Sequence, residues 1–224
     1  MTATLYTLDA LKAHQRYRNA AGKRVKGVTT VLGVIEKPGL HNWYYECGLD
    51  GIDPNKKRDE AAAIGTIAHA RVEAFLHGME LDETGIATER LDKSANAFLS
   101  FMEMWKREGM TVVESELQMV SEKWQTGGTL DVLASRPDGR LLLRDVKTSN
   151  GLWNEHYIQT ATYAAMYEET HPGRVIDEVW IDHLPKDESG ECRSYEVRDR
   201  EKWVAAFVAA NDLYMALQNL PKVR

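Results

Sequence analysis

The chain has 224 residues, of which 43% are hydrophobic and 28% are charged, and its formal net charge is −6. This composition is typical of a folded, water-soluble protein that buries a core in one large domain or two small ones. No apolar run approaches the roughly 20 residues of a membrane span, and the N-terminus lacks the pattern of a secretory signal. We therefore expect a cytoplasmic protein with no membrane partner. Its two cysteines are too few for a four-thiolate cluster, so no iron–sulfur cluster is expected.

Basic residues cluster in two places, residues 16–26 and residues 56–58, although the chain as a whole is acidic. The net charge argues weakly against a nucleic-acid binder. Each basic cluster taken alone is equally well explained as a solvated loop. Residues 6–26 are polar and punctuated by glycine, which predicts a strand or a loop in place of a packed helix.

The next part of the chain is predicted to be mainly helical. Residues 28–35 are apolar and β-branched, which leaves a short helix and a strand both open, and residues 37–40 end that run. After a loop at residues 50–55, helices are predicted over residues 60–77 and 89–108. The second helix has a predicted apolar stripe of Leu91, Ala95, Phe98, Leu99, Met102 and Trp105.

The apolar period then changes to two, which predicts strands over residues 111–120, 127–134 and 140–147. A hairpin turn at residues 136–139 joins the last two, so the three strands should form an antiparallel meander. A helix follows over residues 154–170.

The C-terminal part is predicted to contain a strong strand at residues 175–184, a turn at 185–190 and a weaker strand at 191–198. Asp199 should cap a final helix that runs to Leu220. The order of helices and strands favours one α/β domain with a mixed sheet flanked by helices.

One strand carries an acid and an amine on the same face, because residues two apart on a strand point the same way. These are Asp145 and Lys147, with Val146 pointing into apolar packing between them, and Asp131 on the preceding strand supplies a second carboxylate. Carboxylates are the ligands that Mg²⁺ and Mn²⁺ prefer, and a lysine beside the metal can act on the attacking water. An ordinary salt bridge also explains an isolated pair of this kind.

Three further pairs share a face by the same reasoning, although each pair alone has an ordinary structural explanation. They are His69 with Glu73 and Gln159 with Tyr163 on helices, and Glu114 with Glu116 on a strand.

Taken in order, these motifs are G-T-x-x-H, E-x-E, G-G-T-L-D, D-V-K-T-S and Q-x-x-x-Y. The series, which spans His69 to Tyr163, resembles the RecB-type branch of the PD-(D/E)xK nuclease superfamily, which includes CRISPR-associated and phage exonucleases. Residues 28–32, 37–40 and Trp43 are similar to the N-terminal part of phage and mitochondrial members. The resemblance implies a restriction-endonuclease-like α/β core. It also implies a single nuclease domain over residues 1–224, with an N-terminal segment (1–58), a motif-bearing core (59–170) and C-terminal strands and helix (171–224).

The resemblance also assigns roles around one metal centre. Asp131 and Asp145 are expected to bind Mg²⁺ or Mn²⁺ together with the carbonyl of Val146, and His69 should complete the metal shell. Glu116 is the member of its pair expected to approach the metal.

Other residues are expected to act on the water or the substrate. Lys147 should position the water nucleophile and stabilise charge, while Gln159 and Tyr163 hold Lys147 or a substrate phosphate. Thr66 and Thr148 are expected to contact DNA. Glu73 is a candidate partner that orients His69.

The implied function is a metal-dependent DNA nuclease, an exonuclease acting on linear ends or on single or double strands. The expected setting is recombination, repair or replication in a bacterium or a phage-infected cell, with a recombinase, annealing protein or helicase as partner. The aromatic residues Trp43, Tyr44 and Tyr45 are candidates to stack on unpaired bases, although buried packing is favoured for them. The alternative is a non-catalytic module that binds DNA ends or a recombinase, against which the intact acids and lysine argue.

Overall fold

The structure is a computed structural model, and it describes residues 5–8, 16–184 and 191–221. Its centre is a mixed sheet, described here by its strands in chain order. These are β2 (Lys26–Gly27), β4 (Thr111–Ser121), β5 (Thr126–Ser135), β6 (Leu141–Lys147), β7 (Glu178–His183) and β8 (Arg193–Glu196). A small separate parallel pair consists of β1 (Leu5–Tyr6) and β3 (Glu80–Leu81).

The predicted meander is confirmed, because β4 pairs with β5 and β5 with β6, both antiparallel. The strand β7 then pairs in parallel with β6, and β8 returns antiparallel beside β7. The start of β5 also pairs in parallel with β2. The sheet is therefore mixed, as the sequence predicted.

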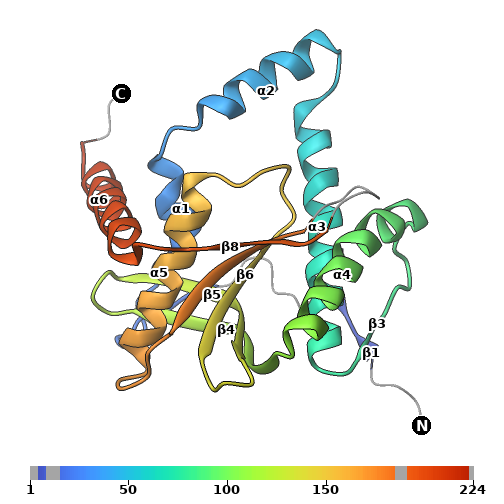
Figure 1. The fold of residues 1–224 in the computed structure, drawn as a ribbon. Coiled ribbons are helices and arrows are strands. Elements are labelled where there is room, and N and C mark those ends of the chain that lie inside the picture. The colour runs from blue at the N-terminus through green and yellow to red at the C-terminus, as the bar shows by residue number, and fades with distance from the viewer. Residues whose placement is uncertain (1–4, 9–15, 185–190, 222–224) are drawn as a thin grey trace.

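Helices cover both faces of the sheet (Figure 1). They are α1 (Val28–Val31), α2 (Pro38–Leu49), α3 (Pro54–Leu76), α4 (Thr88–Glu108), α5 (Asn154–Thr170) and α6 (Arg200–Gln218). Helices α1, α5 and α6 bury one face of the sheet around Leu143 and Phe207. Helices α3 and α4 bury the other face around Phe101 and Val146. Apolar surface is removed from water on both faces, which is the main stabilisation of such a layered fold.

The N-terminal helices differ most from the sequence predictions. Residues 28–35 form α1 followed by a 3₁₀ turn (Leu32–Val34), which decides between the helix and strand alternatives. A further helix, α2, begins at Pro38, where the sequence predicted only a break. Proline suits the first position of a helix, because a backbone N–H at that position would have no hydrogen-bond partner within the helix.

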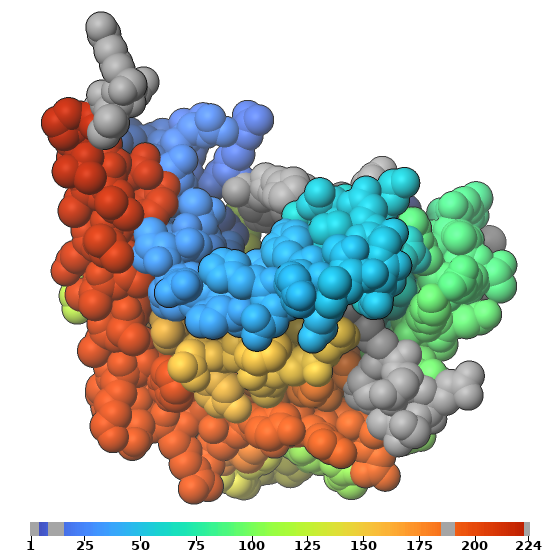
Figure 2. Space-filling model, turned by 90° about the horizontal axis from the view of Figure 1, so that it is seen from above, coloured from blue at the N-terminus to red at the C-terminus, as the bar shows by residue number. Residues whose placement is uncertain are grey.

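Helix α2 lies across one face of the molecule together with the start of α3 (Figure 2). The sequence favoured buried positions for the aromatic residues of this helix. That prediction is wrong for Tyr44 and Tyr45, whose exposed fractions are 37% and 69%. Helix α3 begins at Pro54, earlier than predicted, because the side chain of Asp53 accepts hydrogen bonds from the backbone N–H groups of Asn55 and Lys56.

Two other predictions are corrected. The apolar stripe of α4 is rotated, since Leu99 is exposed, while Ala97, Phe101 and Met104 are buried. Of the predicted stripe, Trp105 is buried as expected. Asp199 stands at the start of α6 but makes no capping hydrogen bond, and its carboxylate pairs with Lys202.

The turn predicted at residues 185–190 lies outside the described residues, and the strands on either side of it are shorter than predicted. Within the described ranges, the helices lack the combination of length and apolar character that a bilayer span requires.

Candidate active site

Asp131 lies where β5 and β6 separate. The last paired residues of this antiparallel ladder are Val132 and Arg144, so one step further places Asp131 opposite Asp145. Here the Oδ2 atom of Asp131 accepts a hydrogen bond of 2.7 Å from the backbone N–H of Val146. The side chain of Asp131 therefore accepts the hydrogen bond that a backbone carbonyl of β5 would accept in a continued ladder. Asp131 and Asp145 thus occupy neighbouring positions where the two strands separate.

Glu116 brings a third acid from β4 on the other side of β5. It has a left-handed backbone conformation with φ of 47°. Consecutive residues on a regular strand point to opposite faces, yet Ser115 and Glu116 both approach α3. The hydroxyl of Ser115 donates to Glu73, and the Glu116 carboxylate lies near His69. A strained residue of this kind costs about 1–3 kcal/mol and is typical of functional sites.

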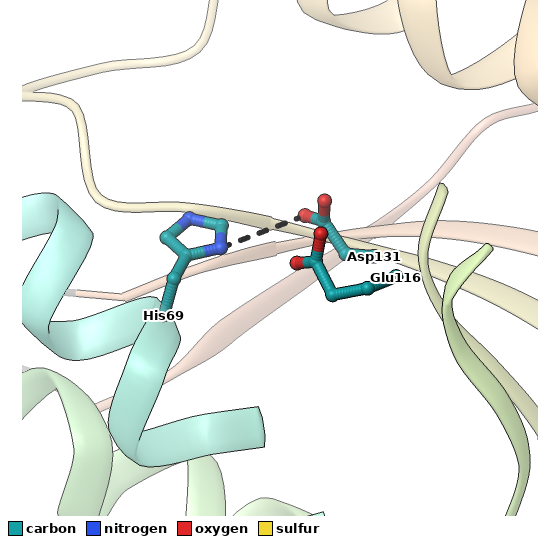
Figure 3. Close-up of side chains that lie close together, drawn as sticks. All are labelled: His69, Glu116 and Asp131. Atoms are coloured by element: carbon teal, nitrogen blue, oxygen red, sulfur yellow. Dashed lines mark ion pairs between the residues drawn. The ribbon is translucent and has the colours of Figure 1, made fainter. Parts of the chain in front are cut away.

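His69 projects from α3 toward these acids, as Figure 3 shows. One ligand atom each from His69, Glu116 and Asp131 lies within 4.8 Å of the others, and His69 Nδ1 is 4.0 Å from Asp131 Oδ2. Burial, and after it the positive charge of Lys147, lower the pKa of His69 to about 4. The imidazole is therefore neutral at pH 7, which is the form that binds metals.

Asp145 and Lys147 meet on one face of β6. The carboxylate of Asp145 has no exposed surface, and its Oδ2 atom is 2.5 Å from the Nζ atom of Lys147. Neither Asp145 oxygen has a partner with acceptable hydrogen-bond geometry among the described residues. Val146, between them, is buried against α3 and α4, as the strand periodicity predicted. Buried carboxylate oxygens normally have partners, and here the ion pair with Lys147 compensates the charge of Asp145.

The site holds more acidic than basic side chains. Burial raises the pKa of Asp131 and of Asp145, and Lys147 partly offsets this effect for both. Burial also raises the pKa of Glu116, to about 8, and the charge of Asp131 adds to the shift. Three acids, a neutral imidazole and one lysine leave an excess of oxygen ligands, which is the donor set that suits a hard divalent cation.

Glycines in the motifs allow three close approaches. A Cβ atom on Gly65 would lie 2.7 Å from the hydroxyl of Thr148, so only glycine lets α3 lie this close to the segment after β6. A Cβ atom on Gly128 would lie 2.4 Å from the ring of Tyr163. On Gly127 it would lie 2.0 Å from the ring of Tyr17, which the sequence analysis did not single out.

Among the predicted substrate-contacting residues, Tyr163 lies near enough to Asp145 and Asp131 for their charges to act on it. The amide of Gln159 donates a 2.8 Å hydrogen bond to the hydroxyl of the buried Tyr163. In the described part of the chain, neither side chain has a hydrogen bond to Lys147. Thr66 is exposed on α3, and its hydroxyl donates to its own helix at the carbonyl of Ala62.

Glu73 is buried but does not contact His69 in the expected way. Its Oε1 atom accepts a 2.6 Å hydrogen bond from Ser115 and lies 3.0 Å from His77 Nε2, which is also 2.9 Å from the Ser115 hydroxyl. These three side chains therefore tie α3 to the strand residue next to Glu116. The sequence signal was present, since Glu73 and His77 lie one helical turn apart.

Two more residues near the centre were missed. Burial raises the pKa of Tyr6 to about 12, and the charges of Glu73 and Glu116 act in the same direction. On α5, burial lowers the pKa of His156 to about 4, and the charge of Lys147 contributes. The position of His156, three residues before Gln159, was a signal that both lie on one helix face.

The family model of the PD-(D/E)XK nuclease superfamily matches residues 40–221. Among solved structures, SSO0001 is 17% identical over 61% of this chain, with a TM-score of 0.36, and the match covers less than two thirds of that protein, 64%. A protein of Eubacterium rectale, provisionally named an exonuclease, is 14% identical over 95% of this chain and 79% of its own, with a TM-score of 0.42. A comparison with curated proteins finds no match. Because the family model covers most of its length, the chain belongs to the PD-(D/E)XK nuclease superfamily.

Proposed function

We propose that this chain is a divalent-metal-dependent deoxyribonuclease whose catalytic domain spans residues 1–224. The observation that carries the proposal is the approach of His69, Glu116 and Asp131, whose ligand atoms lie within 4.8 Å of one another. The buried Asp145, which forms an ion pair of 2.5 Å with Lys147, lies opposite Asp131 in the strand register. Buried acids that outnumber the nearby cations are costly in a folded protein unless a further positive ligand binds them. The chain belongs to the nuclease superfamily, and these acids lie where the paired part of β5 and β6 ends, so we place the chemistry there.

The metal ligands in this proposal are Asp131, Asp145, His69 and Glu116, with the backbone carbonyl of Val146. Oxygen ligands dominate, so Mg²⁺ fits, and the neutral imidazole of His69 favours Mn²⁺ as well. When bound, such an ion neutralises charge on the scissile phosphate and lowers the pKa of a water.

Lys147 acts as a cation. Its pKa is raised because the attraction of Asp145 and Asp131 outweighs the effect of burial, so its ammonium group stays protonated at neutral pH. It therefore donates hydrogen bonds to the water nucleophile and stabilises negative charge that develops on the phosphate. Gln159 and Tyr163 support the same phosphate, because burial raises the pKa of Tyr163 well above its usual value and keeps its hydroxyl a donor.

The contacts of Glu73 with Ser115 and His77 hold the strand at Glu116 in place. A left-handed residue with a charged side chain needs such support, because the relaxed strand would turn Glu116 away from His69. We assign Glu73 to positioning Glu116 through Ser115.

The finer assignment rests on the motif resemblance. It is an exonuclease that acts on linear DNA ends or single strands in the cytoplasm of a bacterium or phage-infected cell. It would work in recombination, repair or replication, with a recombinase, an annealing protein or a helicase. Thr66 and Thr148 remain proposed DNA contacts at the edge of the site.

The test is a time course on DNA labelled at the 5′ or 3′ end, single- or double-stranded, with Mg²⁺, Mn²⁺ or EDTA. We expect metal-dependent cleavage whose products reveal polarity and strand preference. Asp145→Ala should abolish cleavage, while Asp138→Ala, in the exposed turn between β5 and β6, should not. Full activity of Asp145→Ala would sink the assignment. Gel retardation without cleavage in any metal would favour the non-catalytic binding module.

A further inference from the structure

Residues 16–27 form a compact hairpin, called here the basic hairpin. The backbone N–H of Val25 donates to the carbonyl of Tyr17, and Arg18 pairs with Arg24 in an antiparallel bridge. Its tip is a tight turn in which Gly22 has φ of 74° and donates to the carbonyl of Asn19. The darkest blue atoms of Figure 2 include this part of the chain and lie at the molecular surface.

The basic hairpin concentrates unpaired positive charge. It contains five exposed basic residues and no acidic residue, in a chain whose net charge is −6. None of these five forms an ion pair within the described ranges, unlike most other arginines that the structure describes. The five are Arg16, Arg18, Lys23, Arg24 and Lys26.

The arrangement of these charges works against the stability of the hairpin itself. Arg18 and Arg24 lie directly opposite each other, and like charges at opposed positions of an antiparallel pair are destabilising. The half-buried Tyr17 and Val25 alternate with exposed basic residues, so the positive side chains share the outward face. A rigid surface that holds repelling cations together is suited to an anionic partner with closely spaced charges.

The basic hairpin is anchored to the strand that carries Asp131. Its last residues form β2, which pairs with the start of β5. The ring of Tyr17 lies on Gly127, and its hydroxyl is 2.9 Å from the hydroxyl of Thr129. Thr129 is two residues before Asp131, a distance of about 7 Å along a strand. At the tip, the amide of Asn19 donates to Gln125 at 2.6 Å.

We propose that the basic hairpin binds the sugar–phosphate backbone of DNA and guides the strand toward Asp131. The substrate class rests on the proposed nuclease function, whereas the binding surface rests on the charges and contacts of the hairpin. Phosphate contacts set the register of a nucleic acid without reading its sequence, which suits a nuclease that accepts any strand end.

The test measures binding of fluorescein-labelled DNA to the full chain by anisotropy, in EDTA and over a series of salt concentrations. Arg18→Ala/Arg24→Ala should weaken binding about tenfold and reduce the slope of log K against log salt by about 1.4 to 1.8, for two lost phosphate contacts. Arg18→Lys/Arg24→Lys should retain most of the slope. The melting temperature should change little, because the alanine substitutions remove a repulsion together with the 2.7 Å hydrogen bond that Arg18 donates to the carbonyl of Gly22.

The matched control is Arg198→Ala/Lys202→Ala. It changes the net charge by the same amount, but these residues already pair with Glu196 and Asp199. Equal effects of the two alanine variants would show that only total charge matters and would overturn the proposal, as would an unchanged slope in Arg18→Ala/Arg24→Ala. Stronger hairpin-dependent binding to anionic phospholipid vesicles than to DNA would also overturn it. Because EDTA prevents metal-dependent cleavage, loss of the hairpin effect and absence of nuclease activity are separate results.

Discussion

The crowded acids of the site should make the metal-free protein less stable as the pH rises above neutrality. Burial and the charge of Asp131 raise the pKa of Glu116 to about 8, from an ordinary value of 4.5. Between pH 4.5 and about pH 8 the unfolded chain has this carboxyl ionised, whereas the folded chain still binds a proton there, and the difference ends as the pH passes the folded pKa. Stability falls with rising pH wherever the folded state binds more protons. The raised pKa values of Asp131 and Asp145 act in the same direction.

The size of the effect follows from the pKa of Glu116. For a pKa of about 8, ionisation between about pH 7 and 8.5 lowers the free energy of unfolding by about 1 kcal/mol. For a protein of this length the melting temperature should drop by about 2–4 °C. The lowered pKa of His69, about 4, acts mainly below this window, because the unfolded imidazole is largely neutral there.

The assay is thermal unfolding in EDTA across this pH range for the wild type, Glu116→Gln and Glu114→Gln. Glu114 is an exposed acid on the same strand, so its variant should follow the wild type, whereas Glu116→Gln should remove most of the slope. Saturating Mn²⁺ should abolish the slope of the wild type and raise its stability by about 2.7 kcal/mol at a hundred times Kd. Equal slopes for the wild type and Glu116→Gln would refute the reasoning.

Three further outcomes are expected. Lys147→Ala should lower turnover on labelled DNA far more than it weakens Mn²⁺ binding by calorimetry, and an unchanged rate would remove Lys147 from the mechanism. Ser115→Ala should weaken Mn²⁺ binding about tenfold or more, because it frees the strand at Glu116, and unaltered affinity would contradict the positioning role. Gly128→Ala should cost about 1–3 kcal/mol in denaturant unfolding, since the new methyl meets Tyr163 at 2.4 Å, whereas Gly33→Ala, with no atom within 4 Å, is the control.

Local patterns in the sequence predicted much of the fold. The period of two over β4, β5 and β6, with a turn at residues 136–139, was sufficient for the meander. It also placed Asp145 and Lys147 on one face of β6, where the structure brings them into contact. These features depend on neighbours in the chain, and for that reason periodicity reveals them.

Features that depend on distant contacts were predicted less well. Helix α2 has little apolar periodicity and exposes Tyr44 and Tyr45, so its pattern gave no helical signal. The buried face of α4 includes Ser94 and Ser100, whose hydroxyls bond to carbonyls of their own helix. A buried face predicted from hydrophobicity alone therefore left out these serines and included the exposed Leu99.

The sequence by itself determined which residues have the chemistry of a metal site, because Asp131, Asp145, Lys147 and His69 stand in motifs of the right kind and order. Only the tertiary structure decided how closely they meet, with one ligand atom each from Glu116, His69 and Asp131 within 4.8 Å of the others. The alternation of a strand determines which face of the sheet a side chain lies on. The strand register, and the left-handed conformation of Glu116 in β4, determine which side chains of other strands and helices it meets. Those depend on contacts such as Ser115 with Glu73, 42 residues apart, which no local pattern encodes.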